Sequence, residues 1–305
     1  MTSVQRKPID NNSLPTEKID RVTAFNKKKR SNGRTILNKL FIYTCLTIGA
    51  VLFIYPFVWM LSASLAPEKQ MSSLVLFPET ISFNSYAQVV DKIPIIRSLI
   101  NSLFVSLSVT FGVIVFGSMI AYALTNLEFK GKNLIFYIII FTMTLPFQIT
   151  LIPQYILMVK FSWVDSYLAL IVPYLINGLS IIIFQQYFKT IPKDMIDAAR
   201  IDGCNEFRIL FRILWPNSVP AIVTVGIMTF MGVWNEVLWP IIVIRNENLM
   251  TMPQLVTLFA VGGRAESQLG VKLAAATMLA LPIVIAYAFF QRYFIQSMAS
   301  SGLKE

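Results

Sequence analysis

Long apolar runs separated by short polar segments dominate the chain. Six of these runs reach about twenty residues or more, the length that a helix needs to cross a bilayer core of roughly 30 Å. They lack the period-two alternation of barrel strands, and only helices or closed barrels span lipid. The pattern predicts an all-α polytopic membrane protein with six transmembrane helices, at about 40–65, 99–124, 134–158, 166–188, 218–244 and 271–292.

Polar segments divide the chain into predicted regions. Residues 1–38 are polar and basic, which predicts a disordered tail before the transmembrane domain at 39–297. Residues 298–305 form a short polar end. Two longer loops interrupt the domain, one at 189–217 before the fifth predicted span and one at 245–270 after it.

Prolines lie within or near the ends of several predicted spans. Neighbouring helices or water can satisfy the carbonyl groups that a proline frees inside a bundle. We therefore expect simple helix kinks at most of these positions, namely Pro56, Pro146, Pro173, Pro240 and Pro282.

The distribution of basic residues predicts how the spans are oriented. The chain has 305 residues, a formal net charge of +10, no histidine and a mean hydropathy of +0.64. If the N-terminus is cytoplasmic, 19 of the 26 lysines and arginines fall in inside segments, as the positive-inside rule favours. Both termini and the 189–217 loop are then cytoplasmic, and the 245–270 loop is extracytoplasmic. Membrane topology and anionic lipid explain the charge, so we infer no nucleic-acid partner.

The residue types that carry most catalytic chemistry are missing or scattered. Without histidine, the chain cannot form a histidine-based triad or a histidine metal site. It has no phosphate-binding loop motif, no CxxC and no pair of carboxylates within a predicted span. We therefore expect no catalytic, metal or cofactor site, and a membrane enzyme is the weakest hypothesis. Transport or scaffolding remains.

A compact charged segment, "DAARIDGCNEFRILFRILWP", occupies residues 197–216 within the 189–217 loop. Pro192 favours a helix start shortly before it, and Gly203 can adopt the left-handed conformation that ends a helix. Four apolar residues then recur at helical spacing and predict one apolar face: Phe207, Leu210, Phe211 and Leu214. The segment is thus predicted to form two short helices, either as a connector on the membrane surface or as a docking site for a cytoplasmic protein.

The spacing in this segment resembles the EAA loop of ABC-importer permeases: E-A-A, three residues, glycine, nine residues, then I-x-L-P. Here the pattern reads Asp197-Ala198-Ala199, Gly203 and Ile213-Leu214-Trp215-Pro216. Asp197 replaces the usual glutamate and keeps its charge, and Trp215 replaces leucine. The runs "FIYPFVWMLSASLAP", "WNEVLWPIIVI" and "FFQRYFIQSMASSGLKE" are similar to the shorter of the two permeases in maltose-type carbohydrate importers.

The resemblance implies a type I ABC importer permease fold in a bacterial cell membrane. It also implies a subunit of an ATP-driven, binding-protein-dependent importer of carbohydrate, oligosaccharides above all. The implied partners are a second permease in a heterodimer, a cytoplasmic ATPase dimer that holds ATP and Mg²⁺, and an extracytoplasmic sugar-binding protein. The alternative is an autonomous secondary carrier or channel whose similarity to the EAA loop is accidental.

The resemblance assigns roles to two sets of residues. Contact with the ATPase is implied for Asp197, Ala198, Ala199, Gly203, Ile213 and Pro216. Contact with the binding protein is implied for the 245–270 loop, with Gly262, Gly263 and Arg264. The end of the chain, at 300–305, would reach into the ATPase dimer.

Glu236 is the clearest ionisable residue within a predicted span, and two interpretations remain open for it. Carriers coupled to ions keep such residues inside the membrane, although a single carboxylate is thin support for ion coupling. Trp234, Asn235 and Glu236 either belong to an interfacial aromatic belt at the outer end of the fifth span or line a sugar path. In a sugar path, tryptophan rings stack on pyranose surfaces while the amide and the carboxylate bind hydroxyl groups.

Overall fold

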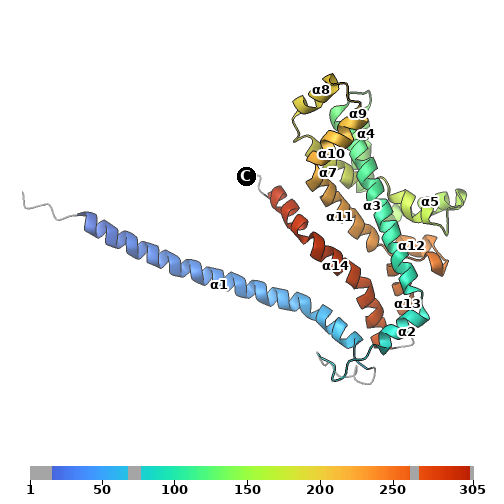
Figure 1. Cartoon of the computed structure of the whole chain (residues 1–305), viewed down its shortest axis with the longest axis horizontal. Helices are drawn as coiled ribbons and strands as arrows, with labels where there is room; N and C mark the ends of the chain where they lie inside the picture. The colour runs from blue at the N-terminus through green and yellow to red at the C-terminus, as the bar shows by residue number, and fades with distance from the viewer. Residues whose placement is uncertain (1–15, 68–76, 262–267, 303–305) are drawn as a thin grey trace, which may run out of the picture. The chain divides into compact units, whose positions relative to one another are not determined.

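The computed structural model describes residues 16–67, 77–261 and 268–302 (Figure 1), and within these ranges the chain is helical with no β-strand. It divides into two units, residues 1–59 and 60–305. The α-helices are α1 (Thr16–Ser64), α2 (Asn84–Lys92), α3 (Ile95–Asn126), α4 (Lys132–Thr144), α5 (Phe147–Lys160), α6 (Tyr167–Ile171), α7 (Gly178–Phe188), α8 (Lys193–Ile201), α9 (Glu206–Ile209), α10 (Trp215–Asn217), α11 (Val219–Trp234), α12 (Leu238–Val243), α13 (Met252–Val261) and α14 (Leu269–Gly302). Two 3₁₀ turns, η2 (Val172–Tyr174) and η4 (Glu247–Leu249), and a π-helical turn, η3 (Leu210–Leu214), complete them.

Two described helices are long and apolar enough to cross a membrane unbroken, Ile36–Ser64 within α1 and the whole of α3. Three more candidates are bent pairs of helices. The bend is 105° between α4 and α5, 41° between the α6–η2 segment and α7, and 87° between residues 206–217 and α11. If each pair is one span, the described residues hold up to five spans. The third pair includes residues 206–217, which the sequence places in the loop before the fifth predicted span. The sixth predicted span falls in α14, which holds the shorter apolar helical stretch Leu269–Ile285.

The span predicted at 134–158 is divided into α4 and α5, with a break in place of the simple kink expected at Pro146. Leu145 has an extended conformation with ψ 122°, because the residue before a proline is disfavoured in the α region. Pro146 also lacks the N–H that would continue the helix. This proline therefore breaks the helix, whereas Pro56 and Pro282 lie inside continuous helices.

α1 begins at Thr16, so residues 16–38 are helical where the sequence predicts a disordered tail. Lysine and arginine are good helix formers, and a helix that is already nucleated in an apolar span extends easily into such residues. At the other end of the chain, α14 continues to Gly302, into the segment predicted as a short tail.

α3 is the central helix of the unit formed by residues 60–305 and packs against α7 and α11. In the same unit, α8 and α9 lie at one end of α3, and α2 and α13 lie at the other (Figure 1). Small residues on a membrane helix let neighbouring backbones approach closely. The buried face of α3 carries Ser98, Ser102, Ser106, Gly112, Gly117 and Ala121. A Cβ atom added at Gly112 would collide with Leu175, so this position requires glycine or a shift of that leucine.

Asn101 fastens the segment between α12 and α13 to α3. Its Nδ2 donates hydrogen bonds to the backbone carbonyl groups of Asn248 (2.8 Å) and Met250 (3.0 Å). The Tyr167 hydroxyl donates to its Oδ1 at 2.8 Å. Asn101 is buried, so this amide satisfies backbone groups that have little access to water.

The 245–270 segment, predicted as a loop between two spans, contains the buried helix α13. Residues 252–256 are buried, and the Met252 backbone N–H donates to Ser102 Oγ at 2.7 Å. The apolar run "MPQLVTLFAV" explains the burial, since ten such residues are too few to span a bilayer but enough for a core helix.

We predict that Asn101→Leu lowers the free energy of unfolding by roughly 2–4 kcal/mol, because it leaves two carbonyl groups without their donor. The measurement is the midpoint of thermal denaturation of the purified chain in detergent. Ser98→Ala is the matched control on the same face of α3, because Ser98 Oγ is buried with no partner among the described residues. The control should leave the midpoint unchanged or raise it. Equal losses in the two variants would contradict this role of Asn101.

Candidate functional site

The charged segment folds into short helices that meet at Gly203, as the sequence predicts. The Cys204 N–H donates to the Ala199 carbonyl (3.0 Å) and the Gly203 N–H to the Arg200 carbonyl (3.0 Å). These two bonds form a Schellman motif, which satisfies carbonyl groups at a helix end. Gly203 has φ +79°, in the left-handed region that favours glycine, so the motif fixes the angle between α8 and α9.

The two alanines of α8 point to different surroundings. Asp197 and Ala198 are exposed, whereas Ala199 is buried together with Ile196. One side of α8 is therefore packed against its own chain, and the other side is open to a partner. Of the four residues in α8 and its cap to which the resemblance assigns a docking role, Ala199 is the one held inside.

The second helix differs from the predicted amphipathic helix in its register. Leu210 and Leu214 are buried as predicted, but Phe207 is 61% exposed and Phe211 is 37% exposed. Ile209 is fully buried in their place. The cause is the π-helical turn η3, in which hydrogen bonds run from i to i+5, because the extra residue shifts the buried face.

Arg200 joins both short helices to the end of α3. Its Nε donates to Glu206 Oε1 (3.0 Å), and its Nη2 donates to Glu206 Oε2 (3.2 Å) and to the backbone carbonyl of Asn126 (3.2 Å). The Tyr122 hydroxyl donates to the same carboxylate. Nη1 also pairs with Asp197 Oδ1 at 3.2 Å. We call Arg200, Glu206, Tyr122 and Asn126 the α3 clamp.

Both charged members of the α3 clamp are stabilised in their ionised forms. Hydrogen bonding to Glu206 raises the pKa of the Arg200 guanidinium, and hydrogen bonding from Arg200 lowers the pKa of the Glu206 carboxyl. The two side chains are 35% and 42% exposed, so water screens their attraction. This bidentate contact therefore acts mainly through its geometry, because it fixes the orientation of α8 and α9.

Trp215, which stands where the EAA pattern has leucine, makes a second link to α3. Its Nε1 donates to Ser118 Oγ at 3.0 Å, and that hydroxyl donates to the Val115 carbonyl at 2.9 Å. Its ring meets Phe211 edge-on, with 4.9 Å between ring centroids. Leucine has no donor for such a bond, so this substitution adds a polar contact. Pro216 beside it is exposed, and Ile213 is half-buried.

The structure divides the fifth predicted span, 218–244, into α11 and α12 at the residues proposed for a sugar path. α11 stops at Trp234, which is buried within the chain and offers no open ring face. Glu236 Oε1 accepts the backbone N–H of Trp239 (3.1 Å), so this carboxylate caps the start of α12. Asn235 is the exposed member of the three. Gly262, Gly263 and Arg264, expected to contact a binding protein, lie outside the described residues.

Sequence reasoning singled out Gly203 and the alanines but missed the α3 clamp. Arg200 and Glu206 carry opposite charges on either side of the predicted turn at Gly203, which was a usable signal. Tyr122 gave none, because it is 84 residues from Glu206 in the sequence and its neighbours are apolar.

A family model described as a binding-protein-dependent transport system inner membrane component matches residues 113–300, a range that holds all four residues of the α3 clamp and the whole 189–217 loop. The chain belongs to this family. The permease is 32% identical over 269 residues to the arabinooligosaccharides transport system permease protein AraQ of Halalkalibacterium halodurans, covering 85% of this chain and 95% of that protein. It is 33% identical over 261 residues to AraQ of Bacillus subtilis, with 84% and 92% covered.

A solved structure supports the fold of the permease independently. A chain of a bacterial ABC transporter involved in the import of the acidic polysaccharide alginate superposes with a TM-score of 0.75. Sequence identity is 24%, and the match covers 85% of this chain and 96% of that chain. The predicted all-α ABC importer permease fold is therefore confirmed.

We predict that Ser118→Ala and Trp215→Phe each lower the free energy of unfolding by about 1–2 kcal/mol, because each breaks one hydrogen bond. The double variant should lose about 1 kcal/mol less than the sum of the two single losses, because the second change removes a hydrogen bond that the first has already broken. Thermal denaturation of the four proteins in detergent measures this coupling. The control combines Ser118→Ala with Trp239→Phe. Their losses should add, because Trp239 Nε1 donates to the Ala169 carbonyl and not to Ser118. Additive losses for Ser118 and Trp215 would contradict the link.

Proposed function

We propose that the permease is the membrane subunit of an ATP-driven, binding-protein-dependent importer of carbohydrate, oligosaccharides above all. The relatives named for arabinooligosaccharide transport support this substrate class. The observation that carries the proposal is the two-sided helix α8. Asp197 and Ala198 are exposed on α8 and accessible to a partner, while Arg200 of the same helix binds the end of α3.

The proposed assembly has four kinds of component. This permease and a second, related permease form the translocation path as a heterodimer, and an ATPase dimer binds below them with ATP and Mg²⁺. A sugar-binding protein delivers the substrate on the extracytoplasmic side. The permease itself is non-catalytic, and both of its termini, together with the 189–217 loop, face the cytoplasm. The distribution of lysine and arginine supports this orientation.

The contacts between α8, α9 and α3 suit the transmission of movement from the ATPase to α3. When the ATPase dimer closes, it moves α8, and the Schellman turn and the α3 clamp pass that displacement into α3. A flexible loop at this position would absorb it instead. α3 is 32 residues long, or about 48 Å. Near its far end Asn101 holds the segment at 248–250, so a movement on the cytoplasmic side reaches the outer side of the same helix.

The position of Glu236 favours ATP-driven transport over an ion-driven carrier. A carrier of that kind needs a titratable group that changes partners during transport. The Glu236 carboxylate instead accepts a backbone N–H at the start of α12, a structural contact typical of a helix cap. Substrate flux driven by an ion gradient through the permease alone in vesicles, without ATP, would contradict the proposal.

We predict that Gly203→Val abolishes oligosaccharide uptake by cells that express the complete importer. Valine is strained at φ +79° by about 1–2 kcal/mol, so α8 changes its angle to α3. Gly203→Asn should retain much of the uptake, because asparagine tolerates the left-handed conformation. The measurement is accumulation of radiolabelled oligosaccharide, with membrane insertion checked by immunoblot.

Gly131→Val is the matched control, since Gly131 has φ +88° but lies outside the 189–217 loop. Neither glycine has an atom within 4 Å of an added Cβ, so the two valine variants differ in position rather than crowding. Uptake should survive in the Gly131 variant. Normal uptake with Gly203→Val, or equal loss in both valine variants, would contradict the coupling role.

A further inference from the structure

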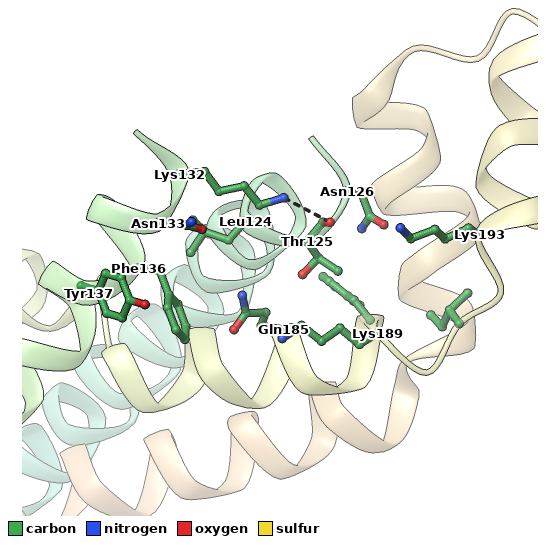
Figure 2. A pocket seen from close by; sticks show the side chains of 12 residues that line it. Leu124, Thr125, Asn126, Lys132, Asn133, Phe136, Tyr137, Gln185, Lys189 and Lys193 are labelled. Atoms are coloured by element: carbon green, nitrogen blue, oxygen red, sulfur yellow. Dashed lines mark hydrogen bonds between the residues drawn. The ribbon is translucent and has the colours of Figure 1, made fainter. Parts of the chain in front are cut away.

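A polar pocket of about 460 Å³ opens between the end of α3, the start of α4 and the end of α7 (Figure 2). Lys193, the first residue of α8, lies at one side of it. The exposed docking residues Asp197 and Ala198 do not line the pocket. It is therefore distinct from the surface proposed to meet the ATPase.

Positive charge surrounds this pocket. Lys132, Lys189 and Lys193 line it, and none of its lining residues is acidic. Lys132 Nζ donates to the backbone carbonyl groups of Leu127 (2.9 Å) and Thr125 (3.4 Å), which holds this ammonium group at the rim (Figure 2). Lys189 and Lys193 are exposed, so both are free to turn toward an anion. The charge selects a negatively charged occupant.

Two amide side chains in the pocket have unused hydrogen-bonding capacity. Gln185 is 5% exposed and lines the pocket, and its Oε1 has no partner among the described residues. The buried Nδ2 of Asn126 also has none. Such groups are normally paired in folded proteins, so an unpaired acceptor and an unpaired donor in one pocket point to a ligand with both functions. A phosphate ester accepts hydrogen bonds, and a hydroxyl group attached to it donates one.

The pocket adjoins a face suited to lipid. α4 begins at its rim, and Leu134, Tyr137 and Ile138 are exposed apolar side chains on that helix. Phe136 and Phe188 line the pocket itself. A ligand seated with its phosphate near the lysines can thus extend hydrocarbon chains along α4, which free phosphate cannot do.

We propose that this pocket binds the headgroup of an anionic phospholipid of the phosphatidylglycerol type. The phosphodiester lies among Lys132, Lys189 and Lys193, and the glycerol hydroxyl groups donate to Gln185 Oε1. Basic pockets between membrane helices on the cytoplasmic side bind such headgroups. The bound lipid connects the end of α3 with the start of α8, because Asn126 belongs to the first and Lys193 to the second.

The test is lipid binding by the full-length permease, measured by native mass spectrometry from detergent micelles, which does not depend on sugar transport. Wild type should retain one phosphatidylglycerol, with phosphatidylcholine bound far more weakly. Lys189→Ala with Lys193→Ala should weaken phosphatidylglycerol binding about thirtyfold, since each lysine near a membrane surface contributes about 1 kcal/mol. Gln185→Leu should weaken it about tenfold. The control, Lys130→Ala with Arg212→Ala, removes equal charge from exposed positions outside the pocket and should leave binding unchanged.

Three results would overturn the proposal. If phosphatidylcholine binds as strongly as phosphatidylglycerol, the pocket does not require an anionic headgroup. Displacement of the lipid by millimolar inorganic phosphate would make free phosphate the ligand. If the double-lysine variant binds the lipid as wild type does but associates more weakly with the ATPase, the pocket is a protein-docking surface. The two lysines are exposed, so their removal should not alter the thermal denaturation midpoint, which is recorded for each variant.

Discussion

The carboxylate of Glu206 is the group on which the arrangement of the 189–217 loop depends. It receives two bonds from the Arg200 guanidinium and one from the Tyr122 hydroxyl, so three separate helices meet at one side chain. The attraction itself is modest, because the pair is partly exposed. Its effect comes from direction, since a planar guanidinium paired with a carboxylate allows few relative orientations of α8 and α9. Without it, α8 and α9 would lose the side-chain contact that joins them directly across the turn at Gly203.

α3 connects this contact with the rest of the unit formed by residues 60–305. At one end it carries Tyr122 and Asn126, and further along it carries Ser118, the partner of Trp215. Near its other end Asn101 binds the segment before α13. Between these polar contacts, small side chains let α7 and α11 pack closely, which suits helices that associate within lipid. Polar contacts at both ends and close packing in the middle favour movement of α3 as one body.

The sequence pattern predicted those features that depend on neighbouring residues in the chain. The positions of the long apolar helices follow from length and hydrophobicity, and the hinge at Gly203 follows from the preference of glycine for positive φ. The break at Pro146 could be located but not its 105° size, because the packing of α4 and α5 sets that angle. The burial of α13 within the predicted loop depends on neighbouring helices. The register at η3 depends on them too, and two of the four residues predicted to share an apolar face, Phe207 and Phe211, are exposed there. The Tyr122–Glu206 contact joins distant parts of the chain and leaves no trace in either neighbourhood.

The most direct test of the central claim is the distance between α8 and α3 during the ATP cycle. Spin labels at Met195 on α8 and Phe111 on α3, both exposed positions, would be introduced after the native Cys45 and Cys204 are replaced by serine. Double electron–electron resonance on the assembled importer then compares nucleotide-free and ATP-bound states. A rigid α3 clamp predicts the same distance distribution in both states. A distribution that shifts by several ångströms when ATP binds would show that α8 moves independently of α3, and would contradict the account.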